Sequence, residues 1–385
     1  MEFIFYCLIY FLGIKLDVSV KYINIVGDKM DVKTYFSNKL SKMLFLEIKR
    51  EKVEQAFNLK VDSNIYLPIK SEDIISKVKA GDNLDNIPMS FFVEGMFFVL
   101  GADNKFRFNK VYEKIINNLP KSEDYIKGRI FQEVKKENFE DCYAFLKGLC
   151  KISSTEEVYD KLILVLEKLR IQDKMYMDEE LNVLENAKSI NGYNKPYLYE
   201  AIINREKGEF KKALVSLNKY IEMGGKETSE VIAIKSSLED VTDIEDGKEL
   251  MVSNPTDALK KLLPLIDRFA DDPIIYYYIG VSYRNLENYD KAIYYLNKSL
   301  EIDNSLMDVV NELAINYACI GNYDVAIKYL RKIFEAEKSI EVCTNLIMCY
   351  ANKGDIEQVK NHIEIAKKID PNDEVLNDII TQLNN

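Results

Sequence analysis

The chain has 385 residues, 47% of them hydrophobic and 30% charged, a composition that excludes a disordered protein and a mainly membrane-embedded one. Its net charge of −11 is unevenly distributed: residues 30–121 carry 15 Lys and Arg against 12 Asp and Glu, whereas residues 122–385 carry 34 against 48. Because phosphate recognition depends on basic contacts, the acidic majority argues against a nucleic acid partner. It favours a protein or peptide partner, and a basic one is the easiest to attract.

An apolar stretch occupies residues 1–29. Its apolar run from Phe3 to Ile14 is shorter than the roughly 20 residues that cross a bilayer, and no small-residue cleavage site follows, so we expect no stable membrane span. The sequence "VGDKM" (26–30) can be encoded with a ribosome-binding sequence just before Met30. We therefore expect translation to start at Met30, with a signal or membrane anchor as the alternative, and N-terminal sequencing of the natural protein distinguishes the two.

The cysteines and the histidine do not suggest a metal site. No C-x-x-C pair occurs, and no cysteine clusters with the single histidine, His362. We expect the cysteines to be reduced and buried in a cytoplasmic protein: Cys7, Cys142, Cys150, Cys319, Cys343 and Cys349. The acidic stretch at 240–249 lacks the alternating ligands of a calcium loop, and no phosphate-binding or nucleophile motif occurs. We therefore expect no catalytic residue, no cofactor and no metal.

Residues 30–121 read as a mainly helical domain that resembles no family. The pattern predicts a helix over 33–57, a short extended segment in "NIYLPI" (64–69), and two helices within 87–119 around a Gly-Ala-Asp-Asn turn. The segment contains no histidine and no cysteine. Four phenylalanines are predicted to be core, with an exposed docking patch as the alternative: Phe91, Phe92, Phe97 and Phe98.

A repeated pattern follows. "YRNLENYDKAIYYL" (283–296) matches "YACIGNYDVAIKYL" (317–330) 34 residues later, and "YANKGDIEQVKNHI" (350–363) follows after 33 more. "NREKGEFKKALVSL" (204–217) has the same pattern, and a fainter copy lies at 135–149. Repeats of this length predict helical hairpins that bury their apolar faces only by stacking.

The chain resembles the tetratricopeptide repeat family, whose 34-residue unit is a helix–turn–helix. The matching first-helix and second-helix residues are Tyr276, Ile279, Gly280, Tyr283, Ala292 and Leu296. The resemblance is strong over 194–225 and 273–373, fair over 239–270, weak over 122–190 and absent from 1–121. It implies an all-α fold: a right-handed superhelix of roughly six or seven stacked helical hairpins over 122–373, capped by a helix at 374–385, behind the N-terminal domain.

Residue types support this prediction independently. The small Gly280 and Ala314 allow a partner helix to approach closely, and Asn288, Asn322 and Gly354 suit the short turns. The spacing from Ala213 to Ala258 is 45 residues rather than 34. We therefore expect a longer helix or an irregular insertion near 224–254.

The resemblance also implies where a ligand binds, because first helices line the concave groove of such arrays. The predicted groove residues are those that packing does not use: Leu198, Ile202, Arg205, Tyr277, Val281, Arg284, Asn285, Asp308, Asn311, Ile315, Thr344 and Met348. Aromatic, aliphatic and Asn side chains together suit a peptide, because Asn can hydrogen-bond its backbone.

The sequence thus predicts a non-catalytic scaffold that binds a protein or peptide in its groove. One alternative is a peptide-responsive bacterial regulator with 30–121 as its output module. Another is an enzyme of unrecognised type in the N-terminal domain, which would need a polar pocket there. The partner and the oligomeric state do not follow from the sequence.

Overall fold

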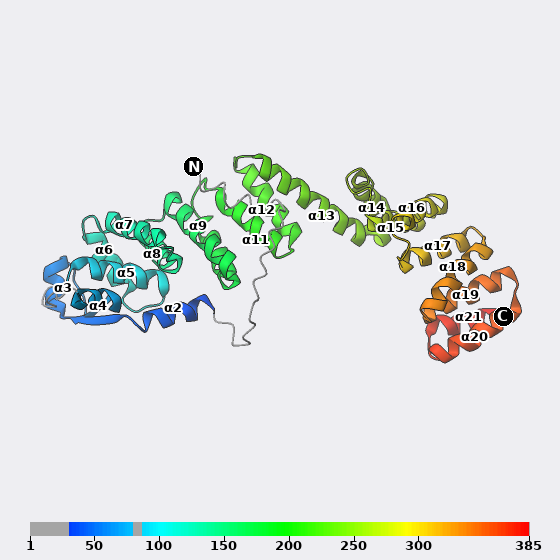
Figure 1. Ribbon diagram of the computed structural model, residues 1–385, viewed down its shortest axis with the longest axis horizontal. Helices are drawn as coiled ribbons and strands as arrows, with labels where there is room; N and C mark the ends of the chain where they lie inside the picture. The colour runs from blue at the N-terminus through cyan, green and yellow to red at the C-terminus, as the bar shows by residue number, and fades with distance from the viewer. Residues whose placement is uncertain (1–30, 80–86, 385) are drawn as a thin grey trace. The chain divides into compact units, whose positions relative to one another are not determined.

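A computed structural model describes residues 31–79 and 87–384, which form two compact units divided between Ile190 and Asn191 (Figure 1). The apolar stretch 1–29 and the expected start at Met30 lie outside the described residues. The N-terminal unit consists, in chain order, of α2 (Val32–Leu40), β1 (Leu44–Ile48), α3 (Arg50–Phe57), β2 (Ile65–Ile69), α4 (Ser71–Lys79), α5 (Met89–Ala102), α6 (Asn109–Asn118), α7 (Ser122–Lys135), α8 (Phe139–Ile152), α9 (Glu156–Gln172), η1 (Lys174–Tyr176) and α10 (Met177–Ala187).

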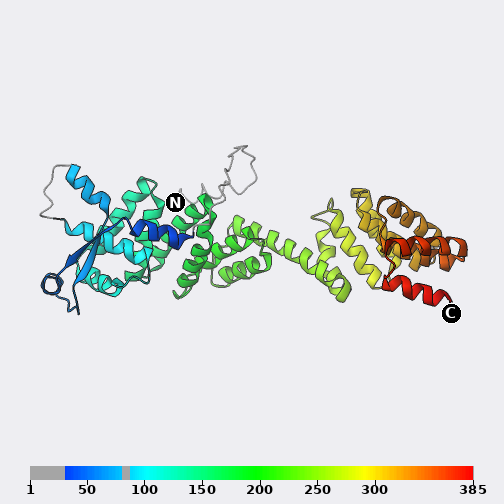
Figure 2. The ribbon, with the colours of Figure 1, turned by 90° about the horizontal axis from the view of Figure 1, so that it is seen from below.

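The helix predicted over 33–57 is wrong in its middle, where β1 separates α2 from α3. β1 pairs antiparallel with β2, with Phe45 opposite Pro68, and β2 also packs against α5 (Figure 2). The short apolar run of β1 is compatible locally with either a helix or a strand. Its pairing with β2, which is distant in the sequence, makes it a strand. The extended segment predicted at 64–69 and the two helices predicted within 87–119 are confirmed as β2, α5 and α6.

Helix α5 forms the core of the N-terminal unit. Phe92, Phe97 and Phe98 are buried, as predicted, and Phe91 is half-buried. This helix also contacts α8, backbone against backbone.

Two glycines allow this contact. A Cβ atom on Gly101 would lie 1.8 Å from the carbonyl oxygen of Ala144, and one on Gly148 would lie 2.1 Å from that of Phe97. Both distances are far below any allowed contact, so each position requires glycine.

The C-terminal unit is a series of helical hairpins. Its elements are α11 (Lys195–Glu206), α12 (Phe210–Glu222), α13 (Ser229–Ser253), α14 (Pro255–Leu262), η2 (Leu263–Leu265), α15 (Pro273–Asn285), α16 (Tyr289–Ile302), α17 (Met307–Cys319), α18 (Tyr323–Ala336), α19 (Ile340–Lys353), α20 (Ile356–Ile369) and α21 (Glu374–Asn384). Helices pair in sequence from α11/α12 to α19/α20, and α21 packs on α19 and α20. The predicted all-α fold of stacked hairpins is confirmed.

Small residues lie at the closest approach within the hairpins. A Cβ atom on Gly280 of α15 would lie 2.6 Å from Cγ of Leu296 of α16, and Gly247 of α13 meets Leu262 of α14 in the same way. Ala292 is fully buried beside this contact. The larger side chain on the second helix therefore fills the space that the glycine leaves.

The predicted turn residues have the expected roles. Asn288 and Asn322 cap α16 and α18, where each side chain accepts a hydrogen bond from a backbone N–H of the first turn. Gly354 ends α19 with a φ of +83°, a conformation that glycine adopts at no steric cost.

The lengthened spacing corresponds to α13, which has 25 residues where α15 and α17 have 13. Its first half packs with Ala213 and Leu217, and its second half with Ala258 and Leu262. The long helix thus joins two separate apolar clusters.

Residues 122–190 belong to the N-terminal compact unit, and the domain boundary at 121/122 stays a prediction.

The prediction that the cysteines are buried is confirmed only in part among the described residues. Cys142, Cys343 and Cys349 are buried, whereas Cys150 is half-buried and Cys319 is exposed. Cys319 is the last residue of α17, beyond the part of the helix that packs. All five are free thiols.

The α5–α8 contact gives a test with an internal control. Gly148→Ala forces the two backbones apart and is expected to lower the free energy of unfolding by about 2 kcal/mol or more. Gly128→Ala in α7, where nothing lies within 4 Å of the new Cβ, is expected to raise it by up to about 1 kcal/mol, because Ala favours helix. Urea unfolding followed by circular dichroism measures both, and equal effects of the two substitutions would refute the close contact.

Candidate functional site

The predicted site lies on the first helices of the C-terminal unit, and polar contacts join neighbouring first helices. Arg284 of α15 forms an ion pair with Glu312 of α17, with 2.6 Å between Nε and Oε2. Asn285 Nδ2 donates a hydrogen bond to the carbonyl oxygen of Met251 of α13 at 2.8 Å. We call the surface that carries the twelve predicted residues the first-helix face.

These twelve residues lie at three depths. Asp308 and Met348 are exposed, whereas Val281 and Thr344 are 3% and 5% exposed and offer a ligand almost no surface, because neighbouring helices cover them. The other eight are half-buried: Leu198, Ile202, Arg205, Tyr277, Arg284, Asn285, Asn311 and Ile315. That these residues contact a ligand stays a prediction.

Helices α15 and α17 bring part of the set together. Tyr277 of α15 packs on the apolar cluster that contains Val309 and Leu313 of α17. Burial, together with the negative charges of Glu312 and Asp308, raises the pKa of Tyr277 to about 12. The hydroxyl is therefore protonated at neutral pH and can donate a hydrogen bond to a ligand.

The three predicted residues on α11 belong to a different patch. Leu198 packs with the cluster of Ala201, Ala213 and Leu217, which α13 separates from the cluster around α15. The structure therefore does not bring Leu198, Ile202 and Arg205 together with Tyr277.

Asn311 has an unusual environment on this face. Its Oδ1 atom is buried without a hydrogen-bond partner, although the residue is half-buried. The Nδ2 groups of Asn285 and Asn316 donate to the carbonyl oxygens of Met251 and Glu312, but Oδ1 of Asn316 is buried without a partner, as Oδ1 of Asn311 is. A buried acceptor without a partner costs about 1–3 kcal/mol, and a ligand donor would relieve this cost once the carboxamide turned outward to meet it.

Sequence reasoning missed the role of Glu312. It is the partner of Arg284, and its side chain is 12% exposed. The two residues are 28 positions apart in adjacent repeats, and their opposite charges were the only available signal. Arg284 is therefore engaged in joining helices, where it had been predicted to face a ligand.

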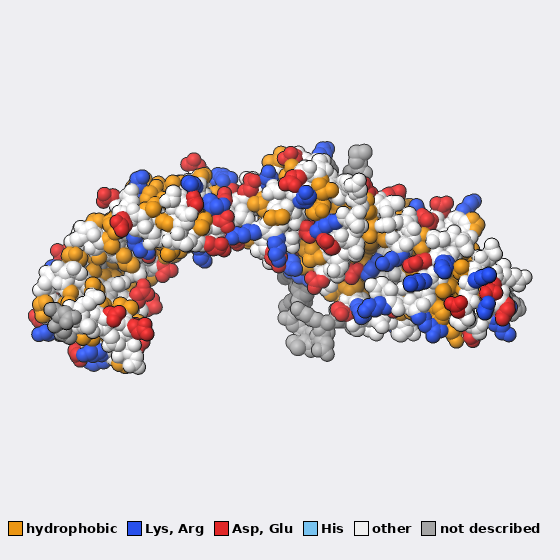
Figure 3. Space-filling view, turned by 180° about the vertical axis from the view of Figure 1, so that it is seen from behind, with side chains coloured by type: hydrophobic (Ala, Val, Ile, Leu, Met, Phe, Trp, Pro, Cys, Tyr) orange, Lys and Arg blue, Asp and Glu red, His pale blue; other side chains and the backbone are white. Residues whose placement is uncertain are grey.

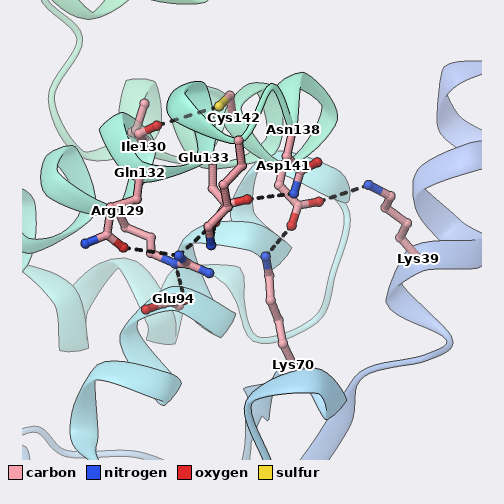
Figure 4. Close-up of polar contacts among 11 residues, drawn as sticks. Lys39, Lys70, Glu94, Arg129, Ile130, Gln132, Glu133, Asn138, Asp141 and Cys142 are labelled. Carbon is pink, nitrogen blue, oxygen red and sulfur yellow. Dashed lines mark hydrogen bonds and ion pairs between the residues drawn. The ribbon is translucent and has the colours of Figure 1, made fainter. Parts of the chain in front are cut away.

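A second polar cluster lies inside the N-terminal unit, where the alternative of an enzyme requires a polar pocket. Asp141 of α8 accepts hydrogen bonds from Lys39 of α2, at 2.9 Å, and from Lys70, which follows β2 (Figure 4). Burial alone would raise the pKa of Asp141, but Lys70 and Lys39 hold it below its ordinary value.

Arg129 of α7 continues the cluster by joining two buried carboxylates (Figure 4). Its Nε lies 2.9 Å from Oε2 of Glu94 of α5, and its Nη1 lies 2.7 Å from Oε1 of Glu133. Each of these charged groups is paired with a group of opposite charge, either on a neighbouring element or one turn along the same helix. Helix packing therefore accounts for this cluster. The cluster does not support the alternative that the N-terminal domain is an enzyme.

The remaining groups that could carry chemistry are the single histidine and the cysteine and acidic side chains of the described residues. His362 is half-buried on α20, with its ring centroid 5.0 Å from that of Tyr350. Within 31–79 and 87–384, no group of His, Cys, Asp and Glu could hold a metal ion. In the same ranges, no helix has both the length and the apolar character that a bilayer crossing requires.

Comparison with known proteins identifies the repeat. Residues 273–306, which contain α15 and α16, match the family model described as tetratricopeptide repeat. Residues 273–306 thus form a tetratricopeptide repeat, as the sequence predicts for this segment. A comparison with curated proteins gave no match.

Solved structures with similar helical arrangements were also found. The C-terminal part of a TPR repeat-containing protein from Cytophaga hutchinsonii is 16% identical, with 65% of this chain and 98% of that chain covered and a TM-score of 0.39. MamA is 19% identical, with 46% and 92% covered and a TM-score of 0.36. YrrB, described as a TPR protein with an unusual peptide-binding site, is 16% identical, with 50% and 94% covered and a TM-score of 0.34.

The buried cluster predicts a pH effect at Asp73 of α4. Burial, and then the charge of Glu94, raises the pKa of Asp73 to about 6, and its Oδ2 is buried without a partner. A carboxyl whose pKa is raised on folding contributes stability below its unfolded pKa, and that contribution is lost as the pH rises through about 6. Asp73→Asn is therefore expected to raise the melting temperature more at about pH 8 than at about pH 4.5.

Glu72→Gln is the matched control, because Glu72 is exposed on the same helix turn. Its effect on the melting temperature should be small at both pH values. If Asp73→Asn shifts the melting temperature equally at both, the carboxyl is not held protonated by burial.

Proposed function

We propose that this protein is a non-catalytic scaffold that binds an extended peptide segment of a partner protein on the first-helix face of α15, α17 and α19. The observation that carries the proposal is the half-buried Asn311, whose Oδ1 atom has no hydrogen-bond partner among the described residues. The tetratricopeptide repeat match over α15 and α16 supports an interaction role.

The chemistry of the face fits an extended backbone. An Asn carboxamide has both donors and an acceptor, so it can pair with the C=O and N–H groups that an extended peptide presents. The protonated hydroxyl of Tyr277 adds a donor on the neighbouring helix. Ile315 and the exposed Met348 offer apolar surface for the side chains of the peptide.

Charge favours a basic partner. The only arginine of the face on α15 and α17, Arg284, is neutralised by Glu312, whereas Asp308 and Glu341 are exposed. In Figure 3, acidic side chains gather near the C-terminal end of the molecule, and Lys and Arg side chains gather over the N-terminal unit. A peptide with Lys or Arg near Asp308 would gain electrostatic attraction that weakens with added salt.

A non-catalytic role fits the position of the single histidine, the residue type used most often in general acid–base chemistry. His362 lies on α20, a second helix, and its Nδ1 lies 2.9 Å from the carbonyl oxygen of Gln358 on the same helix. Its ring packs against Tyr350. Helix packing thus accounts for the contacts of this histidine.

Selection from a displayed random-peptide library on the full chain tests the proposal. Selected peptides are expected to be rich in Lys and Arg, and their affinity is expected to fall with added salt. Asn311→Ala and Tyr277→Ala should each weaken binding about tenfold, the effect of losing roughly 1.4 kcal/mol of contact energy. Fluorescence anisotropy of labelled peptides measures the affinities.

Asn297→Ala and Tyr294→Ala are the matched controls, because both residues lie on α16, a second helix. They should leave the affinity unchanged, and circular dichroism should confirm that all four variants are folded. The proposal fails if the α16 variants weaken binding as much as the first-helix variants, or if neither first-helix variant weakens it.

A further inference from the structure

An aromatic cleft lies in the N-terminal unit, whereas every residue of the proposed peptide site belongs to the C-terminal unit. Its volume is about 330 Å³, and its lining residues come from β1, from β2 and from the segment between α5 and α6. We call it the aromatic cleft and define it by these residues: Phe45, Tyr66, Phe106, Arg107 and Phe108.

The strand register places two of the rings on one face of the sheet. Phe45 lies opposite Pro68, and Glu47 lies opposite Tyr66, so the side chains of Phe45 and Tyr66 point to the same side. The ring of Phe106 stacks on that of Phe45 with 5.5 Å between centroids. The centroid of Phe108 lies 6.0 Å from that of Tyr66.

Tyr112 of α6 fixes these rings from below. It is fully buried, its hydroxyl donates a hydrogen bond to the carbonyl oxygen of Tyr66, and its ring stacks on Phe106 with 5.9 Å between centroids. The aromatic walls of the cleft are therefore held by packing in the absence of a ligand, which lowers the entropy cost of binding.

Arg107 supplies the only charged group of the lining. Its guanidinium carbon lies 4.2 Å from the ring centroid of Phe108 and 5.5 Å from that of Tyr66. The residue is exposed and forms no ion pair with any carboxylate of the described residues. A guanidinium stacked on a ring lies parallel to it, and its N–H groups point outward in its own plane. These N–H groups therefore remain open to an anion.

We propose that the aromatic cleft binds a ligand that combines an aromatic ring with a carboxylate. The ring would pack against Phe45 and Phe106, and the carboxylate would accept two parallel hydrogen bonds from Arg107. A planar carboxylate matches the guanidinium fork in geometry and charge. Lys105 on the same segment and Lys110 in the first turn of α6 are exposed and add positive potential around the cleft.

This chemistry has two sources, a free aromatic acid or an aromatic residue within an acidic peptide. The inference does not rest on the proposed function. It concerns an acidic ligand on the N-terminal unit, whereas the proposed function concerns a basic peptide on the C-terminal unit. Loss of binding in an α15 or α17 variant would leave it intact.

Fluorine NMR of the full chain tests the inference with a matched pair of probes. N-acetyl-4-fluorophenylalanine carries the carboxylate, and N-acetyl-4-fluorophenylalaninamide carries the same ring without it. The acid is expected to bind at least about fivefold more tightly than the amide, since a charged group strengthens the hydrogen bonds from Arg107. A third probe places 4-fluorophenylalanine between two glutamates in a capped tripeptide. Binding tighter than that of the free acid identifies a peptide as the source, and weaker binding identifies a free acid.

Two variants show which residue binds the carboxylate of the ligand and which binds its ring. Arg107→Gln should bring the acid to the affinity of the amide, and Phe45→Ala should weaken both probes. Lys105→Gln is the control, because Lys105 lies two residues from Arg107 but outside the lining. The inference is overturned if no probe binds at millimolar concentration, if acid and amide bind equally to the unmodified chain, or if Arg107→Gln leaves their difference unchanged while circular dichroism shows a folded protein.

Discussion

Close approach of helix backbones at glycine and alanine positions is the constraint on which the rest of this structure depends. In the C-terminal unit, Gly247 and Gly280 each receive a leucine of the second helix, and Ala292 is fully buried at the same crossing. In the N-terminal unit, Gly101 and Gly148 bring α5 and α8 into backbone contact. An added methyl group at Gly101 or Gly148 would meet backbone and force the two helices apart, since interiors are close-packed.

This packing determines which surfaces remain for binding. The inner faces of each hairpin are used for helix contacts, and neighbouring first helices are joined through Arg284–Glu312 and Asn285–Met251. A patch with Tyr277, Asp308 and Asn311 remains on α15 and α17. Asp308 is exposed, Tyr277 is half-buried, and Asn311 has a side-chain oxygen without a hydrogen-bond partner. The long helix α13 interrupts the series, so the corresponding residues of α11 belong to another patch.

The repeat carried most of the information that the sequence offered. Its spacing predicted the hairpins, their turn residues and the lengthened segment, because each follows from local chemistry that recurs every 34 residues. Where no repeat existed, prediction was weaker. The strand β1 was taken for helix, since only its pairing with β2 distinguishes the two. The contact between Gly101 and Gly148 joins residues 47 positions apart, and no local pattern indicates it.

The site was predicted less completely than the fold. Helical spacing indicates which side of a first helix faces away from its partner, but it does not indicate how far the next hairpin covers it. That is why Val281 and Thr344 are buried, and why Arg284 is paired with Glu312. The cleft around Arg107 was not predicted, because its rings come from two strands and a loop that only the folded chain brings together.

Site-specific photocrosslinking tests the central claim most directly, that a peptide lies on the first helices. A benzoylphenylalanine would replace Met348, exposed on the first helix α19, or Tyr294, exposed on the second helix α16. With a peptide selected on the unmodified chain, crosslinking is expected from position 348 and not from position 294. Crosslinking from 294 with none from 348 would contradict the account.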